Sequence, residues 1–216
     1  MQPASRAGRY DLAILDFDGV LADSAPWLLR NLSGFLARHG VPPVSDAELE
    51  RLRGVSNREI VRQLGVPLWR LSAMARDMRA LMANHAGEIP LFAGADTFLA
   101  GISAAKLRVA LVSSNAESTV RKILGERNAR CVTRFACGAS LFGKARNFRR
   151  VVRAEGAHQD RVLVIGDETR DVEAARQAGL ASAAVTWGYA TAAALAACGP
   201  DHLAASFDEL ATLVTG

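Results

Sequence analysis

The sequence predicts an α/β protein built on a parallel sheet, with an all-helical insert after the first strand. Several short apolar runs are continuous rather than alternating, as in strands buried on both faces, and helical patterns follow them. One long segment near the N-terminus shows helical periodicity alone. With 216 residues, 50% of them hydrophobic and 22% charged, the chain can bury a core of this kind, which excludes a disordered or repeat-built protein.

Four apolar runs are expected to form the central strands, at residues 12–17, 107–113, 162–166 and 181–186. A weaker strand is expected around residues 131–137. Helical stretches separate the later runs, at residues 120–124, 148–153 and 172–178. This alternation is typical of a doubly wound, Rossmann-like parallel sheet.

Residues 24–90 break the alternation and are expected to form a helical cap. Four apolar residues fall on one helical face at spacings i, i+4, i+7 and i+8: Leu28, Leu32, Phe35 and Leu36. Ser45 and Ser56 are each followed three residues later by Glu, which is the spacing of a capping box. The predicted organisation is a discontinuous core, 1–23 and 91–216, with a cap at 24–90.

Composition limits the partners and the compartment. The net charge is +4 and the pI is about 9.3, but Arg is scattered through predicted helices, so no nucleic-acid partner is expected. No run approaches the ~18 apolar residues of a membrane span. The three cysteines lack CxxC spacing, which favours a reducing, cytoplasmic compartment over a disulfide framework or a zinc site. The sequence leaves the oligomeric state open.

Asp16 and Asp18 close the first predicted strand and are followed by Gly19, which permits a sharp exit. In an open α/β sheet, ligands bind beyond the carboxyl ends of the strands. Paired carboxylates at that place can hold a hard cation, attack an electrophile, or do both. For an isolated DxD, two residues that cap a turn would be the simpler interpretation.

Polar groups also follow the next two strands. Ser113 and Ser114 end the second strand, and Ser114 has capping-box spacing with Glu117, so hydroxyls and free helix N–H groups are expected to meet an anion there. Lys144 follows the weak third strand, and its compact ammonium suits a phosphoryl oxygen. Taken alone, each feature would be explained by a helix cap or by a solvated lysine.

A further acidic cluster follows the strand at 162–166 and contains Asp167, Glu168 and Asp171. Carboxylates concentrated in this way repel one another unless a cation lies among them. A metal ion is therefore the simplest explanation, although one of the three could serve only to start a helix. All of the candidate ligands are oxygens, which favours Mg²⁺.

These motifs, in this order, resemble the haloacid dehalogenase-like superfamily: DFDGVLADS, a strand that ends in Ser, a Lys, and GDETRD. Within it the chain looks most like the phosphoglycolate phosphatase-like group, through Asp23-Ser24, the loop at 185–189 and the segment at 207–210. The resemblance covers the chain from Leu12 to Leu213. It implies a Mg²⁺-dependent phosphatase with a small helical cap, acting on a small phosphorylated metabolite, with phosphoglycolate as the first candidate.

The resemblance also implies roles for individual residues. Asp16 would be the nucleophile, and Asp18 the acid that protonates the leaving oxygen and later activates water. Ser113 and Ser114 would bind the phosphate, with Lys144 neutralising charge. Asp16, Asp167 and the backbone carbonyl of Asp18 would hold Mg²⁺, with Glu168 and Asp171 acting through water or as alternative ligands. Asp18 could serve as an acid at neutral pH only if its pKa is raised.

Other functions stay open at this point. A dehalogenase would need neither the second Asp nor the acidic cluster, so phosphate chemistry is favoured. A phosphomutase differs mainly in the acceptor of the phosphoryl group, and residues 52–56 resemble the cap loop of sugar-phosphate mutases. A non-catalytic module would not need the complete set of motifs. In the cap, Arg53 and Arg58 are expected to select the substrate, with Arg58 as the main anion contact.

Overall fold

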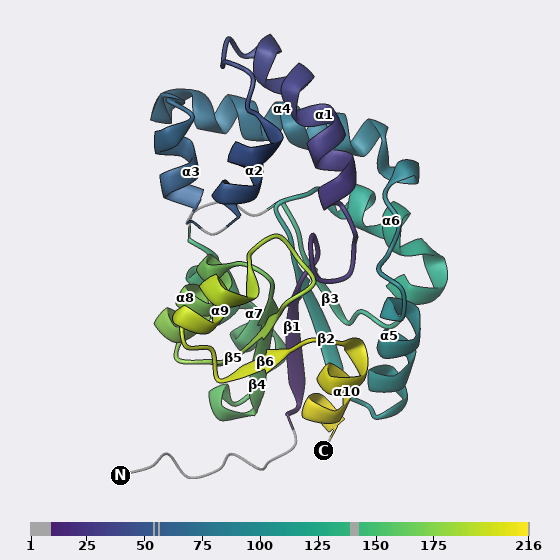
Figure 1. Ribbon diagram of the computed structural model, residues 1–216. Helices are drawn as coiled ribbons and strands as arrows, with labels where there is room; N and C mark the ends of the chain where they lie inside the picture. Colours follow the sequence, from purple (N-terminus) through teal and green to yellow (C-terminus); the bar gives the residue numbers. More distant parts are fainter. Residues whose placement is uncertain (1–9, 54, 56, 139–142, 216) are drawn as a thin grey trace.

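The computed structural model describes residues 10–53, 55, 57–138 and 143–215. At its centre is a six-stranded sheet of order β3-β2-β1-β4-β5-β6, in which all neighbours are parallel (Figure 1). The strands are β1 (Leu12–Asp16), β2 (Arg108–Val112), β3 (Arg134–Ala136), β4 (Val162–Gly166), β5 (Ala181–Val185) and β6 (His202–Ala204). The predicted doubly wound α/β class is confirmed.

Helices cover both faces of the sheet, and the side chains of β1 alternate between the two layers. Ala13 and Leu15 pack in one buried cluster, whereas Leu12 and Ile14 pack in another. Burial on both faces explains why the strand is a continuous apolar run. The helices of the first layer are α5 (Ala95–Ala104), α6 (Glu117–Ala129) and α10 (Phe207–Thr215), and those of the second are α7 (Lys144–Glu155), α8 (Thr169–Ala178) and α9 (Ala192–Ala197).

The segment after β1 is helical, as predicted, and lies over one end of the sheet (Figure 1). Its elements are α1 (Ala25–Arg38), α2 (Asp46–Leu52), α3 (Asn57–Gln63) and α4 (Leu71–Asn84), with 3-10 turns η1 (Leu68–Arg70) and η2 (Ala86–Glu88). We call α1 to α4 the helical cap. It has a hydrophobic cluster of its own around Phe35, Leu36 and Met74. The exact domain limits at residues 23/24 and 90/91 stay a prediction.

One of the two helix starts predicted in the cap is present in the described residues, with the serine half of its capping box formed. Ser45 is the N-cap of α2, and its hydroxyl accepts a 3.3 Å hydrogen bond from the backbone N–H of Glu48. The second predicted cap, Ser56, lies outside the described residues. Among the described helices, none is long and apolar enough to cross a bilayer.

Two details differ from the sequence-based expectation. β6 was not predicted, because it has only three residues, lies at the sheet edge, and leaves Leu203 half exposed, so it lacks an apolar run. Its partner β5 defines it through backbone pairing. The prediction that Ser114 caps a helix was wrong: α6 begins at Glu117 with Ala116 at its N-cap, and no side chain caps it.

Candidate active site

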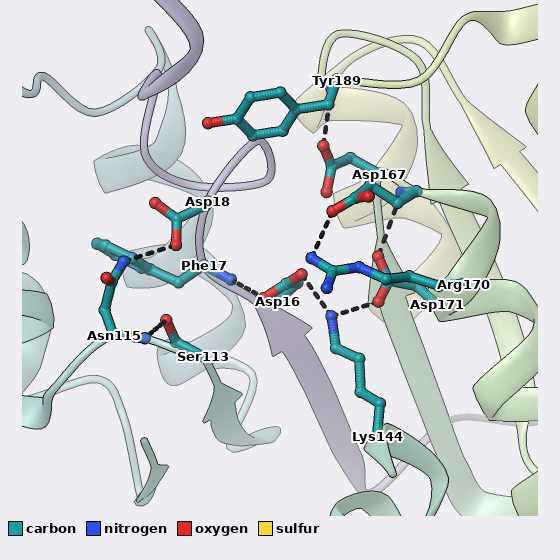
Figure 2. A network of polar contacts seen from close by, with 11 residues as sticks. Asp16, Phe17, Asp18, Ser113, Asn115, Lys144, Asp167, Arg170, Asp171 and Tyr189 are labelled. Carbon is teal, nitrogen blue, oxygen red and sulfur yellow. Dashed lines mark hydrogen bonds and ion pairs between the residues drawn. The ribbon is translucent and has the colours of Figure 1, made fainter. Parts of the chain in front are cut away.

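The strand order brings the predicted motifs together at one edge of the sheet. β1 lies between β2 and β4, so Asp16, Ser113 and Asp167 leave from the carboxyl ends of three adjacent strands. Lys144 is the first residue of α7, in the crossover that follows β3. Figure 2 shows these side chains converging on the end of β1. This is the edge at which open α/β sheets bind ligands.

Both carboxylate oxygens of Asp16 are held in place. Oδ1 accepts a 2.8 Å hydrogen bond from the backbone N–H of Phe17, and Oδ2 lies 2.5 Å from Nζ of Lys144. The side chain is buried, with 7% of the residue exposed. A buried carboxylate with charged and backbone donors on both oxygens has one fixed orientation.

Lys144 supplies the positive charge at this point. Its ammonium group contacts Asp171 as well as Asp16 (Figure 2). Burial acts to lower the pKa of Lys144, but the adjacent carboxylates of Asp16 and Asp171 outweigh it and raise the pKa above its ordinary value. The amine therefore stays protonated at neutral pH and neutralises part of the local negative charge.

Asp18 lies in a different environment from Asp16. Its Oδ2 accepts a 2.8 Å hydrogen bond from Nδ2 of Asn115 (Figure 2). Burial of the carboxyl, and then repulsion from Asp16, raise the pKa of Asp18 to about 6. A carboxyl with this pKa keeps a far larger protonated fraction at neutral pH than an ordinary carboxyl does, as an acid at this position requires.

Asp16, Asp167 and Asp171 form a buried carboxylate cluster, in which one oxygen of each lies within 4.8 Å of the others. Oδ1 of Asp167 is buried and has no hydrogen-bond partner among the described residues. Burial, and then the neighbouring carboxylates of Glu168, Asp171 and Asp16, raise the pKa of Asp167 well above its ordinary value. Converging oxygen ligands with one unsatisfied buried atom fit a hard divalent cation such as Mg²⁺.

Glu168 and Asp171, which the sequence did not distinguish, have different surroundings. Glu168 pairs with Arg170, with Oε1 at 2.5 Å from Nη2. Asp171 belongs to the carboxylate cluster, and its Oδ2 accepts a 3.2 Å hydrogen bond from the backbone N–H of Glu168. Among the described residues, Asp171 and not Glu168 therefore belongs to the carboxylate cluster, where it also contacts Lys144.

The residues that follow β2 line the same site. The hydroxyl of Ser113 is buried and accepts a 3.0 Å hydrogen bond from the backbone N–H of Asn115. This bond fixes the turn that directs the Asn115 side chain to Asp18. Ser113, Ser114 and Asn115 all line the cavity above the sheet.

The loop after β5 carries part of the family resemblance, but none of its residues was predicted to belong to the site. The backbone N–H of Tyr189 donates a 2.8 Å hydrogen bond to Oδ2 of Asp167, and its phenol makes a 2.8 Å hydrogen bond with the hydroxyl of Ser24. A Cβ atom on Gly188 would lie 2.3 Å from Oδ2 of Asp167, so only glycine fits there. Asn115 was overlooked as well. The sequence contained a signal for the loop and for Asn115, because both come just after predicted parallel strands, where ligands bind in open α/β sheets.

The cap contacts the same loop through Arg53. Its Nε donates a 2.9 Å hydrogen bond to the carbonyl of Tyr189, and Nη2 donates a 3.2 Å hydrogen bond to the carbonyl of Gly188. Nη1 pairs with Glu50 at 3.1 Å. Arg53 lines the cavity, but these contacts occupy its guanidinium group. Arg58 belongs to α3, and its side chain lies outside the described part of the structure.

The chain is thus a doubly wound α/β protein with a helical cap after its first strand and a buried carboxylate cluster at the carboxyl edge of its sheet. Residues 13–185 match the family model described as haloacid dehalogenase-like hydrolase. The chain belongs to this family, as its sequence motifs indicated.

Curated relatives align with most of the chain. A phosphoglycolate phosphatase of Synechococcus elongatus is 32% identical over 94% of this chain and 96% of its own length. A phosphoglycolate phosphatase of Xanthomonas campestris is 29% identical, over 84% and 86%. A relative from Mycobacterium tuberculosis is instead named as the tyrosine-protein kinase PtkA, with 28% identity over 84% of this chain and 64% of its length.

Solved structures share the fold. A haloacid dehalogenase-like hydrolase from Streptococcus pneumoniae superimposes with a TM-score of 0.78 at 20% identity, over 94% of this chain and 98% of that one. A protein from Clostridium acetobutylicum, described as a predicted phosphatase, gives a TM-score of 0.81 at 19% identity, over 96% and 99%. At these identities the likeness concerns the fold alone.

Proposed function

We propose that this protein is a Mg²⁺-dependent phosphatase that hydrolyses a phosphate monoester of a small metabolite through a phospho-aspartate on Asp16. The observation that carries the proposal is the pairing of two different carboxyl groups at one strand end. Asp16 is fixed by Lys144 and a backbone N–H, while Asp18 has a pKa raised to about 6. One group suits a nucleophile and the other suits an acid.

In the proposed reaction, an oxygen of Asp16 attacks the phosphorus atom and the bond to the alcohol oxygen breaks. Protonated Asp18 gives its proton to that oxygen, so the alcohol leaves neutral. Asp18, now ionised, takes a proton from water, and the water oxygen attacks the same phosphorus atom. Inorganic phosphate is released, and Asp16 returns as a carboxylate.

The remaining residues would position and neutralise the phosphoryl group. Ser113 and Ser114 offer hydroxyls, and Lys144 offsets the charge of Asp16. Asp16, Asp167 and Asp171, with the backbone carbonyl of Asp18, would hold Mg²⁺, which would reduce the repulsion between the nucleophile and the phosphate. Glu168, whose carboxylate pairs with Arg170, would act through its negative charge or through water, and not as a direct ligand.

The names of the relatives support phosphoglycolate as the first candidate substrate. The cap would select the alcohol part through the segment from Arg53 to Arg58, with Arg58 as the direct contact and Arg53 holding the cap against the loop at Gly188 and Tyr189. A reducing, cytoplasmic setting also belongs to the proposal and is supported by three cysteines that are all unpaired. A phosphomutase would use the same groups but would pass the phosphoryl group to a second hydroxyl instead of water.

Phosphate release tests the proposal directly. Purified protein with Mg²⁺ should release inorganic phosphate from 4-nitrophenyl phosphate and from members of a metabolite panel that includes phosphoglycolate, pyrophosphate and hexose phosphates. Acid quenching during turnover of a ³²P-labelled substrate should leave label on the protein. Absence of release from every ester would refute the phosphatase, and transfer to an added sugar phosphate without release would indicate a mutase.

A further inference from the structure

The helical cap and the carboxyl edge of the sheet enclose a cavity of about 760 Å³. Its floor contains Asp16, Asp18, Ser113 and Lys144, the groups that would handle the phosphoryl group. The walls come from the cap and from the loops at 168–170 and 187–190, so the cap would contact much of the alcohol part of the substrate. Pockets of roughly 300–1,000 Å³ hold ligands of drug size, so this cavity exceeds what the two carbons of glycolate need.

The cap contributes mainly apolar side chains to these walls. They come from all four cap helices and the turn after α3, and include Leu29, Leu32, Leu52, Ile60, Leu64 and Met78. An apolar group that fills this space removes hydrocarbon surface from water on both sides of the contact. A carboxylate placed there would lose its hydration without gaining a partner from these residues.

Few charges balance this apolar surface. Among the described cap residues that line the cavity, the charged ones are Glu50, Arg53 and Arg79. Arg53 is occupied by Glu50 and by the carbonyls of Gly188 and Tyr189. That leaves Arg79 as the available cation among the described lining residues of the cap.

We propose that the preferred substrate carries an apolar alcohol part of several carbons, so that the enzyme hydrolyses alkyl or aryl phosphates better than phosphoglycolate. This inference rests on the proposed phosphatase function, and it replaces phosphoglycolate, the candidate that the names of the relatives support, with a class of apolar phosphate esters. Phosphoryl binding at the floor would be common to all substrates, and the apolar cap would discriminate among them.

A homologous series of n-alkyl phosphates, from methyl to octyl, measures the effect of apolar contact. The longer alkyl alcohols have closely similar reactivity as leaving groups, so differences in kcat/KM report binding by the cap. We expect kcat/KM to rise by about threefold per methylene until the cavity is filled. The kcat/KM for hexyl phosphate should exceed the kcat/KM for phosphoglycolate by about tenfold or more.

Leu29 provides a variant that is expected to fold. It lines the cavity and is 48% exposed, so Leu29→Gln adds polarity to the wall without burying a polar group. The ratio of kcat/KM for octyl over methyl phosphate should fall at least fivefold. Leu68→Gln is the matched control: Leu68 is 74% exposed and does not line the cavity, so the ratio should not change.

The outcomes separate the two proposals. Phosphate release with no chain-length dependence, or an unchanged ratio in folded Leu29→Gln, would overturn the apolar substrate class and leave the phosphatase standing. A preference for phosphoglycolate that is lost in Arg79→Ala or Arg58→Ala would likewise overturn it, and would assign the substrate an acidic end. No release from any ester would contradict the phosphatase function itself.

Discussion

The side-chain amide of Asn115 donates a 2.8 Å hydrogen bond to the carboxylate of Asp18, linking the residues after β2 to those after β1. Ser113 fixes the turn from which Asn115 extends. Asn115 therefore positions the proposed acid, although it was not recognised as a site residue in the sequence.

Asn115→Ala should lower kcat for an alkyl phosphate by about 10-fold or more, because a misplaced acid protonates the alkoxide poorly. With 4-nitrophenyl phosphate, whose leaving group needs no proton, the loss should be small. Steady-state kinetics on both substrates measures this difference. Asn128→Ala is the control, because the side-chain amide of Asn128 in α6 donates to the backbone carbonyl of Leu124, within the same helix. Equal losses on the two substrates would show that Asn115 does not act through Asp18.

The pH dependence should follow from the raised pKa of Asp18, which is about 6. The acid form persists to higher pH than in an ordinary carboxyl and is lost as the pH rises through about 6. The kcat/KM ratio of alkyl to 4-nitrophenyl phosphate should therefore fall between pH 5.5 and 8. Asn115→Ala should move this fall to higher pH, because it removes a donor to the ionised form. A ratio independent of pH would contradict the role of Asp18.

Asp16→Asn should lower the turnover rate by ~10³-fold or more, because an amide oxygen cannot form the acyl phosphate. The protein should still fold. Lys144 keeps Asp171 as a partner, and one charge is removed from a buried cluster of three carboxylates. Phosphate release and thermal melting check the two claims. Ordinary turnover in the folded variant would refute the mechanism.

Removal of metal should abolish activity, and added Mg²⁺ should restore it. Gly188→Ala sharpens this test, because the new Cβ would lie 2.3 Å from Oδ2 of Asp167 and must displace that ligand. The Mg²⁺ concentration for half-maximal activity should rise by about tenfold or more. Gly101→Ala is the control, since nothing lies within 4 Å of a Cβ placed at this site in α5. Full activity after exhaustive chelation would refute the metal site.

Arg53→Ala should raise KM several-fold for all substrates alike, because it removes two hydrogen bonds between the cap and the loop at Gly188 and Tyr189. Arg51→Ala is the matched control, because Arg51 is an exposed residue of α2 whose contact with Glu48 stays within the cap. A rise in KM confined to acidic substrates would instead show that Arg53 contacts the substrate directly, as the sequence suggested.

Some of the site could be predicted because strand ends are marked locally. The continuous apolar runs located β1, β2 and β4, and in a parallel sheet their carboxyl ends share one edge. Asp16, Ser113 and Asp167 were therefore expected together, and the structure places them together. β6 escaped prediction because pairing with β5, rather than its own three residues, defines it.

The sequence by itself determined the fold class, the helical insert and which strand ends carry acids, because periodicity and turn residues act over a few neighbouring positions. Tertiary structure alone decided that Asn115 bonds Asp18, that Asp171 rather than Glu168 joins the carboxylate cluster, and that apolar cap residues face the site. These relationships depend on distances of a few ångströms between segments far apart in the chain. Such distances follow from how the cap and the strands pack against each other. Local sequence patterns do not predict that packing.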